Sequence, residues 1–202
     1  MHVLSSDQLT QRENYKLLIG SIIPRPVALV TTESSTGVLN IAPFSFFNIV
    51  SSDPAIVSIA IQRKNGEEKD TARNFREKGQ GVIHILDEEN VHEANQTAAA
   101  LEPHESELSV ADFEVVPSES VQTPALKEAK IRLEVTVHDR IEIKKEQQVT
   151  ADLFLLKVEK YVIAESVYEE GKIDPEKLAP ISRLAGHDYS KLGEIFTLIR
   201  PN

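Results

Sequence analysis

Apolar and polar positions in the first third of the chain are arranged as short strands. Residues 27–32 form an apolar run, and residues 33–37 contain the small and polar residues of a turn. A second apolar run follows over residues 38–42. Two such runs joined by a short polar turn predict an antiparallel hairpin.

Within the stretch from residue 55 to residue 62, apolar residues alternate with small or polar residues. Its apolar positions are Val57, Ile59 and Ile61, and the positions between them are Ser58, Ala60 and Gln62. A period of two predicts a strand with one apolar face and one face of small or polar side chains. The second face leaves room for a flat ligand.

Further strands are predicted over residues 81–86, 131–138 and 153–162, which are rich in Val, Ile, Leu and Phe. Two helical stretches separate them. Asp70 is a candidate N-cap for a helix over residues 71–78 that Gly79 ends, and an acidic opening predicts a helix over residues 87–101 bounded by Pro103.

About six strands with two or three inserted helices predict a mainly β fold, in which a closed or nearly closed antiparallel barrel removes exposed strand edges. The chain has 202 residues, no internal repeat and no linker long enough to separate two domains. We therefore expect one domain over residues 1–202.

Composition narrows the classes of function. A net charge of −10 disfavours nucleic acid and anionic membranes as partners. No apolar stretch is long enough to predict a membrane span, and the N-terminus lacks the pattern of a secretory signal, which predicts a cytoplasmic protein. Because the chain has no cysteine, thiolate chemistry and cysteine-ligated metals are excluded, so any redox chemistry requires a bound organic cofactor or a non-thiolate metal.

An anionic ligand would need a small cationic pocket within this acidic chain. Arg25, Arg63 and Lys69 are candidates for it, although spacing does not show whether they converge. Lys69 and Thr71 lie beside the predicted N-terminus of the helix after Asp70, and helix N-termini bind phosphate well. The same triplet is also typical of a capped helix start with a solvated lysine.

Four ordered motifs connect these features. They are Pro24-Arg25-Pro26, then Asn40-Ile41-Ala42-Pro43-Phe44-Ser45-Phe46, then Asp53-Pro54, then Lys69-Asp70-Thr71. This series resembles the flavin reductase-like family of FMN-binding split barrels, and the similarity extends loosely to the residues from 183 to 189. The resemblance implies an antiparallel split β-barrel of Greek-key type, a homodimer, and a C-terminal segment over about residues 164–202 that packs as an arm.

The same resemblance implies a set of FMN-binding residues. Asn40, Ser45 and Phe46 would lie at the isoalloxazine ring and ribityl chain, with Ser58 on the adjoining strand. The phosphate would be surrounded by Arg63, Lys69, Asp70, Thr71 and Asn74, with Arg25 close by. Tyr189 would help to cover a flavin, including one bound to a partner subunit.

The function implied is that of an NAD(P)H:flavin oxidoreductase, in which NADH or NADPH reduces FMN and the electrons pass to a monooxygenase or another acceptor. No catalytic side chain and no metal are required, because the cofactor supplies the chemistry. Three alternatives stay open: an FMN electron carrier without nicotinamide turnover, a flavin storage or sensing protein, and an interaction protein with a relic pocket.

Several other residues have ordinary structural interpretations. Ser45 lacks the Gly-x-Ser-x-Gly elbow of a hydrolase. Both His92-Glu93 and the cluster from His104 to Glu107 lack the spacing of a zinc site, so they are interpreted as solvated faces. His84 takes the place of an asparagine that is common in the family, and an interior histidine is the first interpretation for it. The region over residues 101–113 also departs from the family, and the role of His187 stays open.

Overall fold

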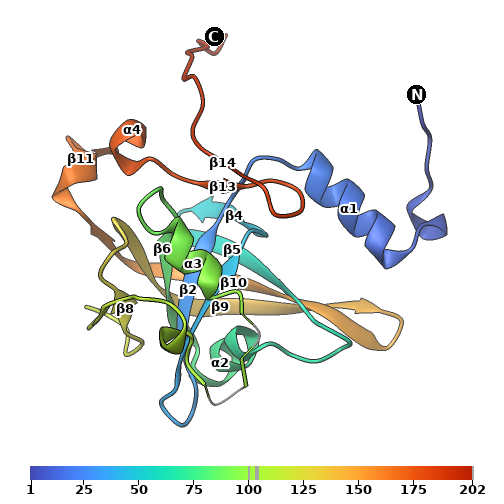
Figure 1. Cartoon of the computed structure of the whole chain (residues 1–202), viewed down its shortest axis with the longest axis horizontal. Coiled ribbons are helices and arrows are strands. Elements are labelled where there is room, and N and C mark those ends of the chain that lie inside the picture. The colour runs from blue at the N-terminus through green and yellow to red at the C-terminus, as the bar shows by residue number, and fades with distance from the viewer. Residues whose placement is uncertain (100, 103–104, 202) are drawn as a thin grey trace.

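The computed structural model describes residues 1–99, 101–102 and 105–201. Its main feature is a seven-stranded antiparallel sheet (Figure 1). In spatial order the strands are β3 (Leu39–Phe44), β2 (Ala28–Glu33), β6 (Gln80–Ile85), β9 (Ile131–Lys145), β10 (Gln148–Ile163), β5 (Ala55–Gln62) and β4 (Phe47–Ser52).

The remaining elements are short. The helices are α1 (Gln11–Ser21), α2 (Asp70–Lys78), α3 (Val91–Gln96) and α4 (Pro175–Leu178), with single 3-10 turns η1 (Ser6–Gln8), η2 (Glu107–Ser109) and η3 (Glu165–Val167). The small sheets pair β1 (Arg25–Pro26) with β13 (Ser182–Arg183) and β14 (Tyr189–Ser190), β7 (Val115–Val116) with β8 (Ala125–Leu126), and β11 (Tyr168–Glu169) with β12 (Lys172–Ile173).

The two strands at opposite ends of the main sheet are consecutive in the chain. β3 pairs with β2 at one end, and β4 pairs with β5 at the other. Only residues 45–46 connect them, so β3 and β4 form one bent segment that brings the two ends of the sheet together. The sheet therefore curls into a barrel, which confirms the predicted mainly β, barrel-like fold.

The barrel interior is filled by one face of each strand and closed by α2. Its largest fully buried side chains include Phe75 from α2 and Phe154 from β10, whose ring centroids are 5.3 Å apart. Gly81 on β6 makes this packing possible, because a Cβ atom there would lie 2.8 Å from both the Phe75 ring and the carbonyl oxygen of Thr31. Helix α2 is thus seated on the end of the barrel by a close approach to β6.

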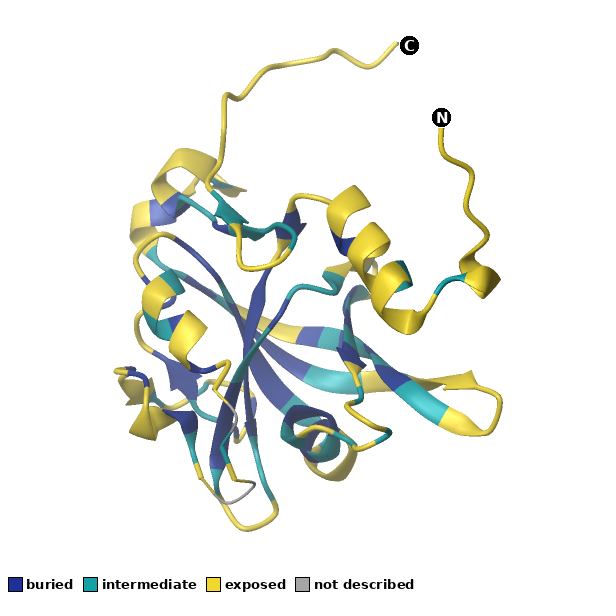
Figure 2. Cartoon of the chain, turned by 45° about the vertical axis from the view of Figure 1, so that its right-hand side comes forward, coloured by how far each residue is buried: buried dark blue, intermediate teal, exposed yellow. Residues whose placement is uncertain are grey.

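A second apolar cluster covers the outer face of β2 and β3. It joins Leu29 and Ile41 to Ala94 of α3, Phe113 and Leu126. Helix α1 lies differently, since it stands away from the barrel and is exposed along most of its length (Figure 2). Within the part of the chain that the structure describes, no helix is long and apolar enough to cross a membrane.

The hairpin predicted from residues 27–42 is confirmed, with Ala28 opposite Phe44 and Glu33 opposite Leu39. The end of α2 is also as predicted, because Gly79 adopts the left-handed conformation with φ of 69°. The predicted N-cap is shifted by one residue, since Lys69 occupies that position and Asp70 begins the helix.

The predicted helix over residues 87–101 is wrong at both ends, since α3 spans only Val91–Gln96 and Thr97 is its C-cap. Asp87 accepts hydrogen bonds from the backbone N–H groups of Glu89 and Asn90, at 2.9 and 3.1 Å. This side chain closes a turn, so α3 begins only at Val91. The expected boundary at Pro103 lies outside the described residues.

His84 is an interior histidine with both ring nitrogens bonded. Its Nδ1 lies 2.9 Å from the carbonyl oxygen of Leu29, and its Nε2 accepts from the backbone N–H of Leu126 at 2.9 Å. An imidazole that donates at Nδ1 and accepts at Nε2 is neutral. Burial lowers the pKa of His84 to about 4, and the neutral ring joins β2 and β6 to the segment that covers them.

We expect Gly81→Ala to destabilise the fold by about 1 to 3 kcal/mol, because the added methyl group would displace Phe75 or the β2 backbone. Urea unfolding followed by circular dichroism measures this change. The control is Gly20→Ala in exposed α1, where a Cβ atom meets nothing within 4 Å. Equal unfolding midpoints for the two variants would contradict the close packing of α2 on β6.

We expect His84 to make stability fall as the medium is acidified. Its folded pKa of about 4 lies below the unfolded value of 6.5, so the unfolded chain binds the proton first. The contribution is fully present above pH 6.5 and is lost between pH 6.5 and about 4, for a total of about 3 kcal/mol.

The measurement compares urea unfolding at pH 7 and pH 5 for the natural chain, for His84→Asn and for His138→Gln, which changes an exposed histidine. The stability lost between the two pH values should be smaller by about 2 kcal/mol in His84→Asn than in the natural chain. A loss of the same size in all three proteins would refute the assignment.

Candidate functional site

The bend between β3 and β4 brings most of the predicted site residues to one region. Phe44, at the end of β3, is buried in the barrel core, whereas Ser45 and Phe46 in the bend are half-buried. The carbonyl oxygen of Phe46 accepts a hydrogen bond from the backbone N–H of Ala60 at 2.9 Å. This bond attaches the bend to β5, so its side chains have fixed positions.

On one side of the bend is a cavity of about 330 Å³, here named the α2 cavity. Its walls are the β3 strand, the start of α2 and the described residues of the segment after α3. Four predicted site residues line it: Asn40, Lys69, Asp70 and Thr71. The structure therefore places the Asn-x-Ala-Pro-Phe motif and the Lys-Asp-Thr motif in one cavity.

The start of α2 leaves hydrogen-bond donors facing this cavity. Lys69 is the N-cap residue, and its side chain makes no capping bond to the first-turn N–H groups. Asn40 donates to Thr71 Oγ1 at 2.8 Å. Because that bond uses the oxygen as an acceptor, the hydroxyl hydrogen of Thr71 is available to donate to a different group. This donor set suits an anion at the positive end of the helix.

Two ammonium groups add positive charge to the α2 cavity. Lys64 and Lys69 both line it, and neither has an ion-pair partner within the described part of the chain. The Lys69 ammonium lies 5.9 Å from the centre of the Phe44 ring. Partial burial, followed by repulsion from Lys64, lowers the pKa of Lys69. A bound anion would relieve both effects.

Four acidic residues of the described chain line the cavity beside the two lysines: Asp70, Glu102, Glu105 and Glu107. Glu102 and Glu105 belong to the segment after α3, where the Glu105 carboxylate accepts from the backbone N–H of Glu102 at 3.2 Å, and the other two are engaged with the barrel and α2. Asp70 pairs with Arg73. Glu107 is buried, and its carboxylate accepts from the backbone N–H of Ile41 at 2.7 Å, on the outer edge of β3. Burial raises the pKa of Glu107. Glu107 therefore protects an otherwise open strand edge.

Arg63 lies outside the α2 cavity. It forms a bidentate pair with the fully buried Asp152, at 2.8 and 3.0 Å, and Arg140 binds the same carboxylate at 2.6 Å. Burial opposes the charge of Asp152, but the hydrogen bonds from the two guanidinium groups outweigh it and lower its pKa. Arg63 is thus committed to an internal ion cluster.

Arg25 is likewise engaged by the protein. Its buried guanidinium donates to the carbonyl oxygens of Ile19 and Ile22 in α1 and its C-cap, and to that of Leu184 at 2.8 Å. These bonds join α1 to the C-terminal part of the chain. The three candidate cations from the sequence therefore do not converge, and Lys64 takes the place expected of an arginine.

The other predicted residues lie in separate places. Asn74 is buried and donates to Thr32 Oγ1 at 3.1 Å, while its Oδ1 has no partner. Ser58 is half-buried on the outward face of β5 and lies 3.5 Å from the carbonyl oxygen of Asn48. Tyr189 lies under the guanidinium of Arg183 and donates to Asn95 at 3.3 Å.

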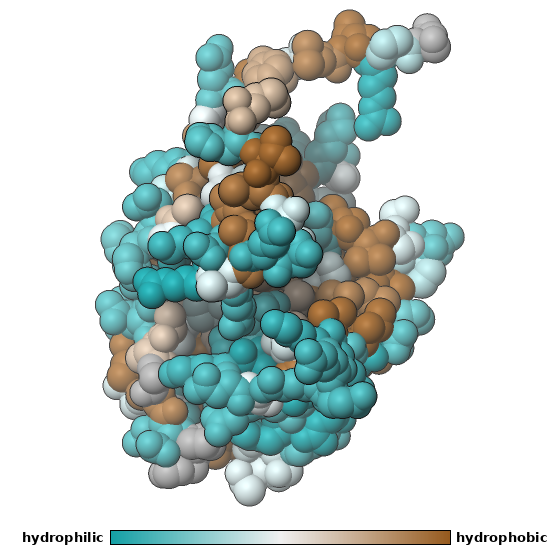
Figure 3. Space-filling model, turned by 90° about the vertical axis from the view of Figure 1, so that its right-hand side faces the viewer, coloured by the Kyte–Doolittle hydropathy of each residue, from teal (hydrophilic) through white to brown (hydrophobic). Residues whose placement is uncertain are grey.

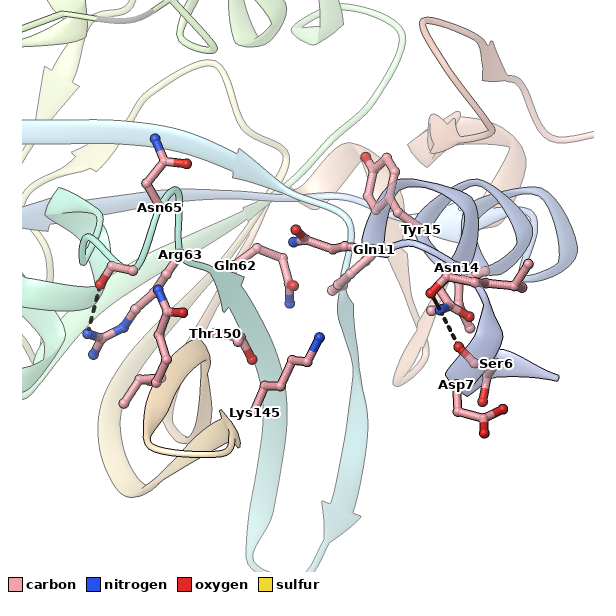
Figure 4. Close-up of a pocket in the computed structure, with 16 residues that line it drawn as sticks. Ser6, Asp7, Gln11, Asn14, Tyr15, Gln62, Arg63, Asn65, Lys145 and Thr150 are labelled. Atoms are coloured by element: carbon pink, nitrogen blue, oxygen red, sulfur yellow. Dashed lines mark hydrogen bonds between the residues drawn. The ribbon is translucent and has the colours of Figure 1, made fainter.

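On the other side of the bend is a larger cavity of about 800 Å³, here named the α1 cavity. It lies between α1, the end of β5 and the β9–β10 hairpin (Figure 4). Phe46 and Arg63 line it. One bent segment thus contributes Phe44 to the first cavity and Phe46 to the second.

Sequence reasoning missed Lys64 and Glu107. Lys64 lies in the short connection between the alternating β5 strand and the Lys-Asp-Thr motif, so its position between these two features was an available signal. The interpretation of Glu107 as part of a solvated face is wrong, because Glu107 is buried. No local pattern indicates this, since its partner, the N–H of Ile41, is 66 residues away. His104 lies outside the described residues, and within those residues no group of three or more His, Cys, Asp or Glu is placed to bind a metal ion.

Comparison with known families supports the interpretation of these motifs. The family described as flavin reductase like domain matches residues 19–179. This range contains the bend, the start of α2 and all seven strands of the main sheet. It excludes most of α1 and the chain after α4.

Three solved structures are similar to the chain. Nitrilotriacetate monooxygenase component B from Bacillus cereus is 49% identical, with a TM-score of 0.96 and 98% of each chain covered. The 2-nitrobenzoate 2-nitroreductase NbaA from Pseudomonas fluorescens is 27% identical, with a TM-score of 0.89 over 99% of this chain and 96% of that one. A split-barrel protein named after flavin reductases, from Shewanella frigidimarina NCIMB 400, shares the fold at 15% identity, with a TM-score of 0.84 and 100% of each chain covered.

Proposed function

We propose, from the premise that this chain belongs to the flavin reductase-like family, that it is an FMN-dependent oxidoreductase that takes electrons from NADH or NADPH. The observation that carries the proposal is the α2 cavity. There the Asn-x-Ala-Pro-Phe motif meets two lysines and the uncapped start of α2.

The residues present fit a flavin mononucleotide. A phosphate monoester needs positive charge and several donors, which Lys64, Lys69, the first N–H groups of α2 and the Thr71 hydroxyl supply. From there a ribityl chain would pass Asn40 and reach the bend at Ser45. Along β5 the outward face carries Ser58 and Ala60, both half-buried, and offers a surface of small side chains to a flat ring.

When bound, FMN supplies a ring that accepts a hydride from the reduced nicotinamide, together with a proton from solvent, and later releases the two electrons to an acceptor. The side chains bind and orient and need not exchange protons. Lys64 and Lys69 neutralise the phosphate, and the Phe46–Ala60 bond fixes the bend. In this proposal Arg25 and Arg63 are positioning residues, because their guanidinium groups hold α1 and Asp152.

We also propose that the reduced flavin serves a separate monooxygenase. The support is the close similarity to nitrilotriacetate monooxygenase component B from Bacillus cereus. A homodimer is part of the same proposal, because large apolar side chains remain exposed in the single chain. They include Leu17 on α1, Ile49 on β4, and Phe196 and Leu198 in the C-terminal segment.

We expect Lys69→Ala combined with Thr71→Ala to weaken FMN binding by about 1.5 to 3 kcal/mol for each charged hydrogen bond lost. Quenching of flavin fluorescence on titration with protein measures the affinity. The control is Lys78→Ala, which removes an exposed lysine from the other end of α2. Equal FMN affinity in the double variant, the control and the natural chain would remove the phosphate assignment.

We expect the FMN-loaded protein to lose its visible flavin absorption when NADH or NADPH is added without oxygen, because hydride transfer reduces the ring. Steady-state oxidation of the nicotinamide in the presence of free FMN measures turnover. Tight FMN binding without bleaching by either nicotinamide would reject the reductase and favour an electron carrier or a flavin-storing protein. A protein that takes up no FMN would leave only the interaction-protein alternative.

A further inference from the structure

The α1 cavity has no part in the phosphate site proposed above, although it is more than twice as large as the α2 cavity. Its volume of about 800 Å³ lies within the range of ligand-binding pockets. Its inner end touches Phe46 in the bend. A ligand in the α1 cavity would therefore reach the same segment that the flavin ring is proposed to contact.

Helix α1 presents a single face to this cavity. Gln11, Asn14, Tyr15 and Leu18 line it, and their spacing places them on one side of the helix. Tyr15 and Leu18 are half exposed even though they face the body of the protein across the cavity. Figure 3 shows hydrophobic side chains gathered over α1, above a mainly hydrophilic surface. The inward face of α1 thus has no protein partner within the described chain.

Helix α1 is stabilised by polar bonds at both ends, and those at its end attach it to the rest of the protein. At its start, Thr10 and Glu13 form a reciprocal capping box. At its end, Arg25 binds the carbonyl oxygens of Ile19 and Ile22. Because only Ile19 of α1 is buried, these polar bonds take the place of packing. Through Arg25, which also donates to the carbonyl oxygen of Leu184, the end of α1 is attached beside the cavity without packing its inward face against the barrel.

The lining of the cavity combines amide groups with two cations, Arg63 and Lys145, and with one carboxylate, that of Asp7 near the start of α1. Figure 4 shows Gln11 from α1, Gln62 from β5 and Lys145 from the β9–β10 hairpin directed toward the same space. Amide side chains both donate and accept, which suits base edges and sugar hydroxyls. Lys145 has no ion-pair partner in the described part of the chain. An anionic ligand with hydrogen-bonding rings fits this combination.

We propose that the α1 cavity binds the adenosine diphosphate part of the nicotinamide dinucleotide, with the Lys145 ammonium against the pyrophosphate. The nicotinamide would then extend past Phe46 toward the flavin ring. This inference rests on the proposed function, which requires a dinucleotide beside the flavin. The inference adds to that function the part of the chain that would recognise the electron donor.

The β9–β10 hairpin provides a matched pair of variants. Lys144 and Lys145 are adjacent, but Lys144 pairs with Glu142 at 3.0 Å and does not line the cavity. We expect Lys145→Ala to weaken binding of ADP and of NAD⁺ to the FMN-loaded protein about tenfold or more, and Lys144→Ala to change it less than twofold. Isothermal titration calorimetry at low salt measures both ligands.

A second variant tests the cavity by filling it. Gln11→Trp places a bulky ring at an exposed position in the first turn of α1, and we expect it to abolish ADP binding while leaving FMN affinity unchanged. In steady state, Lys145→Ala should raise KM for the dinucleotide at least tenfold, with kcat nearly constant. Unchanged ADP and NAD⁺ affinities in both variants would overturn the inference.

Failure of the inference is distinguishable from failure of the proposed function. If the flavin binds and is bleached by NADH, but neither variant affects ADP, the cavity assignment is wrong and the reductase stands. If ADP binding depends on Lys145 while no FMN binds, the cavity assignment stands and the function is wrong. If the variants instead alter the oligomeric state in sedimentation and leave ADP affinity unchanged, the face belongs to an interface between two copies and the inference is rejected.

Discussion

The two-residue connection between β3 and β4 is the constraint on which the rest of the structure depends. These strands are the outermost strands of a seven-stranded sheet, and two residues span only about 10 Å. The sheet must therefore curl until its ends meet. Because Phe44 faces the core before the bend and Phe46 faces outward after it, the same constraint places a cavity on each side of residues 45–46.

The cations of this acidic protein are divided between two tasks. Arginines hold the structure together: Arg63 and Arg140 bind the buried Asp152, and Arg25 binds backbone carbonyl groups. A planar guanidinium with several fixed donors suits such geometry better than an ammonium. Lysines line the cavities instead, with Lys64 and Lys69 in one and Lys145 in the other. The positive charge at the bend is therefore limited to individual ammonium groups, and in the α2 cavity these stand beside carboxylates of Asp70, Glu102, Glu105 and Glu107.

The sequence predicts the features of the fold that local patterns control. Strand alternation identifies β5 and its small-residue face, and the turn before β3 identifies the hairpin. Helix α1 escapes prediction because it buries only Ile19, so it has no apolar periodicity, and its stability comes from a capping box and from Arg25. The role of Arg63 cannot be predicted for another reason. Its partner Asp152 lies 89 residues away in the sequence, and no local pattern indicates that the two residues pair.

The family resemblance identifies the motifs that meet at the bend, but only the structure separates ligand-facing residues from those that position them. Asn40 illustrates the difference, because its amide donates to Thr71 Oγ1. In the proposed site Asn40 would therefore act on a phosphate indirectly, by orienting the Thr71 hydroxyl group. A site built this way depends on the spacing between β3 and α2. That spacing is set by Phe75 against Gly81 inside the barrel, so the packing of the core determines the geometry of the proposed phosphate site.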